Sequence, residues 1–130
     1  MIDWKNPASW SVLVVDDEPD NLDLVAIFLE FKGAKVKTAS NGQDALNSLE
    51  KFKPNLILLD LSMPHMSGWD VHAALQANPA TKVIWTIALT AHAMVTDRKK
   101  VQEAGFNGYL TKPINLPTLI EDLEQAAFDL

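Results

Sequence analysis

The chain has 130 residues, of which 48% are hydrophobic, so it has the length and apolar content of one compact domain. Its formal net charge is -6 and its sequence pI is about 4.9, which argues against duplex DNA or an anionic membrane as the main partner. It has no cysteine, which excludes disulfides and thiolate metal sites and favours a reducing compartment. No stretch resembles a signal peptide or a membrane span, so we expect a cytoplasmic protein.

Short apolar runs and helical periodicities alternate along the chain. The first run, at 11–15, precedes Pro19, which stands at a plausible first helical position of a pattern that Gly33 closes. Further strands are expected at 34–39, 55–60, 83–89 and 107–110. After a turn at Asn41-Gly42, further helices are expected at 44–52, 67–77 and 95–104 and around Leu116, Leu119, Ile120 and Leu123. Five strand-helix units in series predict a doubly wound α/β fold with five parallel strands and five helices.

Polar residues follow four of these strands. In an open parallel sheet the ligand site lies outside the carboxyl ends of the strands, so residues at those ends should converge. The four ends carry Asp16-Asp17-Glu18, Asp60, Thr90-Ala91 and Thr111-Lys112-Pro113. Carboxylates, a hydroxyl and an ammonium are therefore expected in one site.

Such a cluster needs more positive charge than the chain supplies. Two carboxylates about 4 Å apart repel by roughly 4 kcal/mol at an effective dielectric near 20. Lys112 provides one compensating charge, which is too little for three carboxylates. A hard divalent cation with oxygen ligands would balance the site, and Mg²⁺ suits a cluster that also handles a phosphoryl group.

Four motifs in this order resemble the receiver domain of two-component response regulators, in its single-domain, chemotaxis-regulator-like form. The motifs are Val-Val-Asp-Asp-Glu-Pro at 14–19, Leu-Asp-Leu-Ser-Met-Pro-His-Met-Ser-Gly at 59–68, Ala-Leu-Thr-Ala at 88–91 and Tyr-Leu-Thr-Lys-Pro at 109–113. The resemblance implies a flavodoxin-like (βα)5 fold with strand order 2-1-3-4-5. We expect residues 1–10 to form an N-terminal extension and residues 11–130 the receiver domain.

The resemblance implies a role for each acidic residue. Asp60 is the expected phosphoacceptor, whose carboxylate attacks a phosphohistidine of a histidine kinase or His phosphotransfer protein and forms an acyl phosphate. Mg²⁺ is the expected cofactor, held by Asp16, Asp17, Asp60 and the backbone carbonyl of Ser62. The expected protein is not an enzyme beyond assisting its own phosphorylation and dephosphorylation.

The remaining motif residues are implied to stabilise and read the phosphoryl group. Lys112, the Thr90 hydroxyl and the Ala91 amide are expected to contact its oxygens. The Lys112-Pro113 bond is expected to be cis. Thr90 and Tyr109 are the expected switch, with Thr90 moving inward and the Tyr109 ring filling the space that it leaves.

Signalling is then expected to be a population shift that changes one protein-binding surface. That surface comprises the helix at 95–104, the strand at 107–110 and the last helix, which should contact an unknown downstream protein. The basic cluster at 98–100 is expected to be a solvated helix face and, secondarily, part of this surface.

Residues outside the motifs have simpler expected roles. His65 and His72 are expected to be solvated surface histidines, and His92 stands where receivers place a residue that influences water access to the phosphoryl group. Trp4 and Trp10 lie outside any expected core. They and the apolar residues of 126–130 should pack on each other or form a dimer or docking surface.

Three alternatives remain at this point. The chain could be a receiver excised from a hybrid kinase or a longer regulator. A haloacid-dehalogenase-type phosphatase would need a general-acid Asp where the chain has Ser62. A flavodoxin-like flavin carrier would need a phosphate-binding Ser/Thr/Gly loop where the chain has Asp-Asp-Glu-Pro-Asp at 16–20.

Overall fold

Five parallel strands form one sheet with the order β2-β1-β3-β4-β5, which confirms the expected topology. The computed structural model describes residues 2–91 and 95–128. The strands are β1 (Ser11–Val15), β2 (Lys35–Ala39), β3 (Leu56–Asp60), β4 (Trp85–Thr90) and β5 (Gly108–Thr111). Every residue of β3 is buried, because β3 lies between β1 and β4 and helices cover both faces of the sheet.

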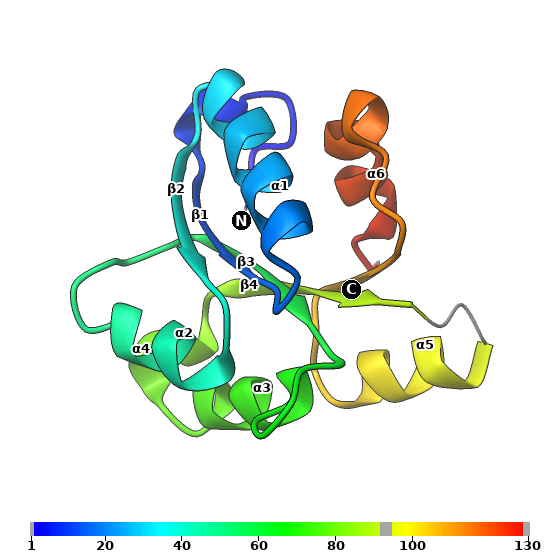
Figure 1. The fold of residues 1–130 in the computed structure, drawn as a ribbon. Coiled ribbons are helices and arrows are strands. Elements are labelled where there is room, and N and C mark those ends of the chain that lie inside the picture. The colour runs from blue at the N-terminus through cyan, green and yellow to red at the C-terminus, as the bar shows by residue number, and fades with distance from the viewer. Residues whose placement is uncertain (1, 92–94, 129–130) are drawn as a thin grey trace.

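Helices cover the two faces in two groups (Figure 1). The helices of the described residues are α1 (Pro19–Phe31), α2 (Gly42–Ser48), α3 (Gly68–Gln76), α4 (Pro79–Lys82), α5 (Val95–Glu103) and α6 (Leu119–Ala126), with short 3-10 turns at Pro7–Ser9 and Leu116–Thr118. α1 and α6 lie on one face, and the other four helices lie on the opposite face. Each face has its own cluster of buried apolar side chains.

Several boundaries differ from the sequence prediction, and the helix expected to end at residue 52 ends at Ser48. The expected turn at Asn41-Gly42 is instead the start of α2, because the Asn41 side chain accepts a hydrogen bond from the Asp44 amide at 2.8 Å and caps the helix. The strand expected from residue 83 begins at Trp85. The residues before it form the additional helix α4, in which Pro79 takes the first position and the Asn78 side chain caps the amide of Ala80.

The N-terminal residues are part of the core rather than outside it. Trp10 is only 1% exposed and Ile2 only 4%, and both pack in the cluster that contains Leu119 and Leu123 of α6. Trp4 meets the edges of both Trp10 and Trp85, with ring centroids 5.6 and 6.0 Å apart. The expectation that the two tryptophans lie outside the core is therefore wrong. The first residues do pack against the last helix.

The last described residues pack on the opposite face. Phe128 is buried in the cluster that includes Val101 and Tyr109, and Ala127 forms an antiparallel bridge with Gly108 of β5. The first residues therefore pack with α6 on one face of the sheet, whereas Phe128 packs on the other face. Asp129 and Leu130 lie outside the described residues. Within the described part of the chain, no helix is both long and apolar enough to cross a membrane.

Candidate functional site

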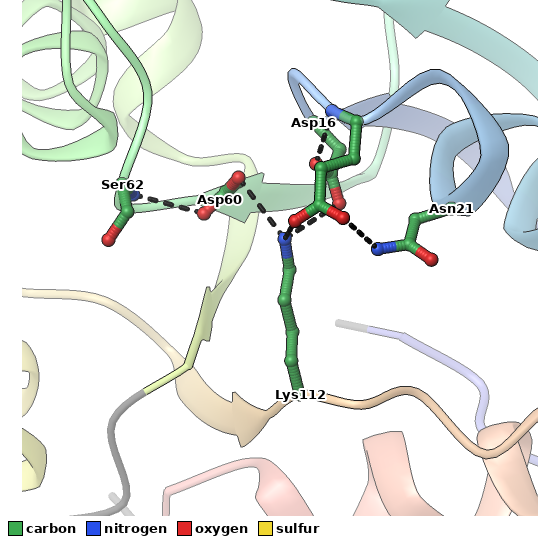
Figure 2. A network of polar contacts seen from close by, with 6 residues as sticks. Asp16, Asn21, Asp60, Ser62 and Lys112 are labelled. Atoms are coloured by element: carbon green, nitrogen blue, oxygen red, sulfur yellow. Dashed lines mark hydrogen bonds and ion pairs between the residues drawn. The ribbon is translucent and has the colours of Figure 1, made fainter.

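Lys112 joins two carboxylates at the carboxyl end of the sheet (Figure 2). Asp16 follows β1, Asp60 ends β3 and Lys112 follows β5. The Nζ of Lys112 lies 3.0 Å from Oδ2 of Asp16 and 3.2 Å from Oδ2 of Asp60. The structure thus brings together three of the residues that the sequence placed at strand ends.

Backbone amides hold the second oxygen of each buried carboxylate. The Ser62 amide donates to Oδ1 of Asp60 at 3.0 Å, and the Glu18 amide donates to Oδ1 of Asp16 at 2.9 Å. Asp60 is 2% exposed and Asp16 is 3% exposed. Each carboxylate is therefore fixed between an amide on one oxygen and the Lys112 ammonium on the other.

Burial and charge act in opposite directions on Lys112. Burial alone would lower its pKa, because it penalises the charged form. The hydrogen bond and charge of Asp16, together with Asp60, outweigh that effect and raise the pKa above its ordinary value. The ammonium is therefore charged at neutral pH and can stabilise additional negative charge in the site.

Glu18 is a member of the site to which the sequence assigned no role. Its Oε1 lies 3.6 Å from the Lys112 ammonium, and its Oε2 accepts a hydrogen bond from the Asn21 amide at 3.0 Å. Asn21 lies three residues further on, within α1, where a side chain can reach back to Glu18. The three-residue spacing between Glu18 and Asn21 is the only hint of this contact in the sequence. Acidic residues and asparagines are common near helix starts without any function, so the spacing does not predict a site.

Three neighbouring acids fit a hard cation. Oxygen atoms of Asp16, Asp17 and Glu18 all lie within 4.8 Å of one another. Carboxylate oxygens are the donors that Mg²⁺ prefers, so this group fits such an ion. It differs from the expected set, which includes Asp60 and Ser62 and lacks Glu18. In the described part of the chain Lys112 connects Asp60 to this acidic group.

The expected phosphoryl-contacting and switch residues lie on β4 and β5. Thr90 is buried at the end of β4, and its carbonyl accepts a hydrogen bond from the Lys112 amide at 2.7 Å. Ala91 is exposed directly after it. Tyr109 is already buried, with 8% exposed, and the Lys112-Pro113 peptide bond is cis. His92 lies outside the described residues.

A glycine allows the loop after β3 to pass close behind Asp60. A Cβ on Gly68 would collide with the carbonyl oxygen of Asp60 and lie 2.8 Å from Cα of Leu61. The Gly68 amide also donates to the Leu61 carbonyl at 3.2 Å. The first residue of α3 therefore supports the backbone of the candidate phosphoacceptor directly.

His72 is not the solvated histidine that the sequence suggested. It is 4% exposed, and its ring stacks on Phe106 with centroids 3.8 Å apart. Burial lowers its pKa, and a hydrogen bond with the Gly105 backbone opposes that effect only partly. The expectation failed because α3 turns this position toward the segment that follows α5. His65, in contrast, is exposed.

The fold and the site belong to one family. A model of the response regulator receiver domain matches residues 12–124 of the chain. The chain is therefore a member of the response regulator receiver domain family. Receiver domains are signalling domains that act with histidine kinases.

Relatives of two kinds are similar to the chain. The polar-differentiation response regulator DivK of Brucella anthropi is 33% identical over 114 residues, which are 88% of this chain and 93% of that protein. The sensor protein GacS of Pseudomonas syringae is 39% identical over 107 residues, which are 80% of this chain but 12% of that protein. The solved chemotaxis response regulator CheY4 of Vibrio cholerae superposes with a TM-score of 0.82 and 29% identity, covering 89% of this chain and 97% of that one.

Proposed function

We propose that the chain is a stand-alone cytoplasmic response regulator that accepts a phosphoryl group on Asp60 from a histidine kinase or His phosphotransfer protein. The observation that carries the proposal is the contact of Lys112 with both Asp60 and Asp16, because it places a nucleophilic carboxylate beside a fixed cation. Family membership supports the same chemistry.

In the proposed reaction an oxygen of Asp60 attacks the phosphorus of a phosphohistidine. The new bond is the O–P bond of an acyl phosphate, and the P–N bond breaks with its electron pair leaving on the imidazole nitrogen. The Ser62 amide and Lys112 orient the carboxylate before attack. Lys112 then stabilises the transferred phosphoryl oxygens, helped by the Thr90 hydroxyl and the Ala91 amide.

Asp16, Asp17 and Glu18 are the grouped acids that would hold Mg²⁺. Asp60 and the backbone carbonyl of Ser62 are the further ligands that the resemblance implies. The ion supplies positive charge to the carboxylates and phosphoryl oxygens. The surrounding residues of the protein orient the Asp60 carboxylate and exclude water from it. Both Asp16 and Asp60 are almost fully buried, which strengthens these electrostatic effects.

Thr90 and Tyr109 are the proposed switch. The side chain of Thr90 is buried at the end of β4, and β4 pairs with β3, which carries Asp60. On its other side β4 pairs with β5, where Tyr109 lies opposite Ala88. A change at Thr90 can therefore reach β5 directly, because β4 and β5 are adjacent strands. The proposed output surface comprises α5, β5 and α6, and its target is another protein.

The relatives favour a stand-alone regulator and keep one alternative. DivK of Brucella anthropi is matched over 93% of its length, which supports a protein of similar size. The similarity to 12% of the sensor protein GacS supports the alternative, in which the chain is the receiver of a larger kinase. The length of the natural protein, measured from cells by mass spectrometry, decides between the two.

The phosphoacceptor role is tested by incubating the protein with acetyl phosphate. We expect labelling of the wild type with Mg²⁺ and none after chelation with EDTA. The Asp60→Asn variant should take no label, whereas Asp23→Asn, which changes an exposed carboxylate of α1, should be labelled normally. Normal labelling of Asp60→Asn would reject the assignment.

A further inference from the structure

The last described residues, 126–128, lie along the outer edge of the sheet. β5 is an edge strand in the order β2-β1-β3-β4-β5, and edge strands offer unpaired backbone groups to other chains. Gly108 and Ala127 form an antiparallel bridge, and the Phe128 amide donates to the Asn107 carbonyl at 2.8 Å. We call residues 126–128 the C-terminal latch, because they occupy this edge.

The latch approaches the strand too closely for any side chain on Gly108. A Cβ at this position would lie 2.8 Å from the carbonyl oxygen of Ala126 and 3.1 Å from Cα of Ala127. Real Cβ atoms do not approach backbone atoms to 2.8 Å. Gly108 therefore provides the space into which an extended segment fits.

Phe128 anchors the latch in a cluster of buried apolar side chains. It is 6% exposed and packs in the cluster that contains Val101 of α5, Phe106 and Tyr109. The guanidinium carbon of Arg98 lies 5.2 Å from the centroid of the Phe128 ring, within the range of a cation–π contact. One aromatic side chain thus bridges α5 and β5.

The latch adjoins an open cavity, which Ala126 also lines. The cavity has a volume of about 440 Å³, and Arg98, Tyr109 and Ala126 are among the residues that line it. Asp122 of α6 also lines it, so the surface offers both a positive and a negative group. The latch therefore covers only part of the surface between α5, β5 and α6.

We propose that the C-terminal latch is an internal competitor for a partner of the α5–β5–α6 surface. The partner is an extended peptide segment that pairs antiparallel with the β5 edge at Asn107 and Gly108 and inserts an aromatic side chain where Phe128 lies. The latch opens before such a segment binds. If it is closed in about 99 of 100 molecules, it weakens the apparent affinity about 100-fold.

The biological role of the latch rests on the proposed function, because that proposal makes this surface the output of the receiver. The backbone contacts that define the latch join Asn107 and Gly108 to Ala127 and Phe128, and none of these residues belongs to the proposed phosphoryl site. The latch is therefore tested without any phosphodonor. A failure to label Asp60 in the acetyl phosphate experiment would reject the proposed function and leave the latch intact.

The test uses a synthetic peptide that copies residues 124–130, Glu-Gln-Ala-Ala-Phe-Asp-Leu. It is titrated into nitrogen-15-labelled wild type and Phe128→Ala, each with all 130 residues, and amide signals of 107–109 are followed by NMR. We expect the peptide to bind Phe128→Ala at least about tenfold more tightly than wild type, because the competitor is weakened. A peptide with alanine in place of phenylalanine should shift nothing. Phe31→Ala, which removes a phenylalanine that is 83% exposed, should behave like wild type.

Hydrogen exchange gives a second measurement that does not require peptide binding. The Phe128 amide should be protected in wild type and should lose protection in Gly108→Ala, whose new Cβ displaces the latch. An unprotected Phe128 amide in wild type would overturn the proposal. Equal peptide affinities of wild type and Phe128→Ala, absence of binding to both, or equal binding of the alanine peptide would also overturn it.

Discussion

The Lys112 ammonium lies 3.2 Å from a carboxylate oxygen of Asp60, although 52 positions separate the two residues in the chain. The contact spans from the end of β3 to the residue after β5, across the end of β4. Both side chains are nearly buried, with 11% of the lysine and 3% of the aspartate side chain exposed. The folded sheet therefore holds an ion pair that solvent screens only weakly.

Removing the lysine charge should destabilise the fold. Lys112→Met leaves the buried carboxylates of Asp16 and Asp60 without their cation, which typically costs about 3–5 kcal/mol. Urea denaturation in EDTA measures this loss. Added Mg²⁺ should stabilise the variant more than the wild type, because the ion replaces the missing charge.

Lys99→Met is the matched control for this experiment. Lys99 is 77% exposed and pairs with Glu103 at 4.0 Å, so its loss should change the unfolding free energy by less than about 1 kcal/mol. Equal stability of Lys112→Met and wild type in EDTA would contradict the importance of the buried pair.

Adding one methyl group behind Asp60 should disturb the site. Gly68→Ala places a Cβ against the Asp60 carbonyl and Leu61, which are backbone atoms that cannot move without shifting the end of β3. We expect a loss of about 2–3 kcal/mol in the free energy of unfolding and slower labelling by acetyl phosphate.

Gly42→Ala provides the comparison, because Gly42 is also the first residue of its helix. There the added Cβ meets side-chain atoms of Met66 and Val71, and the methionine side chain can rotate away. Its labelling rate should stay near that of wild type. A normal rate for Gly68→Ala would show that the backbone at Asp60 tolerates the shift.

His72 should make the stability of the protein depend on pH. Its pKa is lowered in the fold, chiefly by burial, so the unfolded chain takes up a proton at its ordinary pKa of about 6.5 before the folded chain does. The stabilising contribution is present above that pH and is lost as the pH falls below it. His72→Phe keeps a ring against Phe106 but does not titrate.

Urea denaturation at about pH 7.5 and about pH 5.5 measures the difference. Wild type should lose stability relative to His72→Phe as the pH falls. His65→Asn changes an exposed histidine with a φ of 67°, which asparagine tolerates, and should follow wild type. Parallel pH profiles of wild type and His72→Phe would contradict the burial of His72.

Trp10 should be among the side chains on which folding depends most. Its side chain is 1% exposed, and its indole nitrogen donates to the Asp3 carbonyl at 2.8 Å. Trp10→Ala should cost about 3–5 kcal/mol in thermal or urea unfolding. Trp69→Ala, which removes a side chain of a residue that is 37% exposed, should cost clearly less. Equal losses would show that the N-terminal segment does not pack as described.

The sequence predicts the strands and the polar residues at their carboxyl ends, because each strand is a short apolar run and this pattern repeats along the chain. The run at 56–59 is apolar throughout, as a strand buried on both faces requires, and it ends in Asp60. Alternation of strands and helices then limits the topology. For this reason the sequence alone predicts that Asp16, Asp60 and Lys112 lie at the carboxyl end of the same sheet.

Contacts that depend on the paths of the two chain ends could not be predicted. Trp10 and Phe128 lie outside the helices and strands, so no hydrophobic periodicity indicates which face of the sheet they pack against. His72 lies on the same face of α3 as the buried Val71 and Leu75, but a polar histidine at that position does not by itself predict burial. Its stacking partner Phe106 comes from a distant segment. Glu18 was ambiguous because acidic residues near a helix start need no further explanation.

Peptide mapping by mass spectrometry after treatment with acetyl phosphate and Mg²⁺ tests the central claim most directly. The account predicts one phosphoryl group per chain, on the peptide that contains Asp60, and none when EDTA is present. A phosphoryl group on any other residue, or unchanged labelling in EDTA, would contradict it.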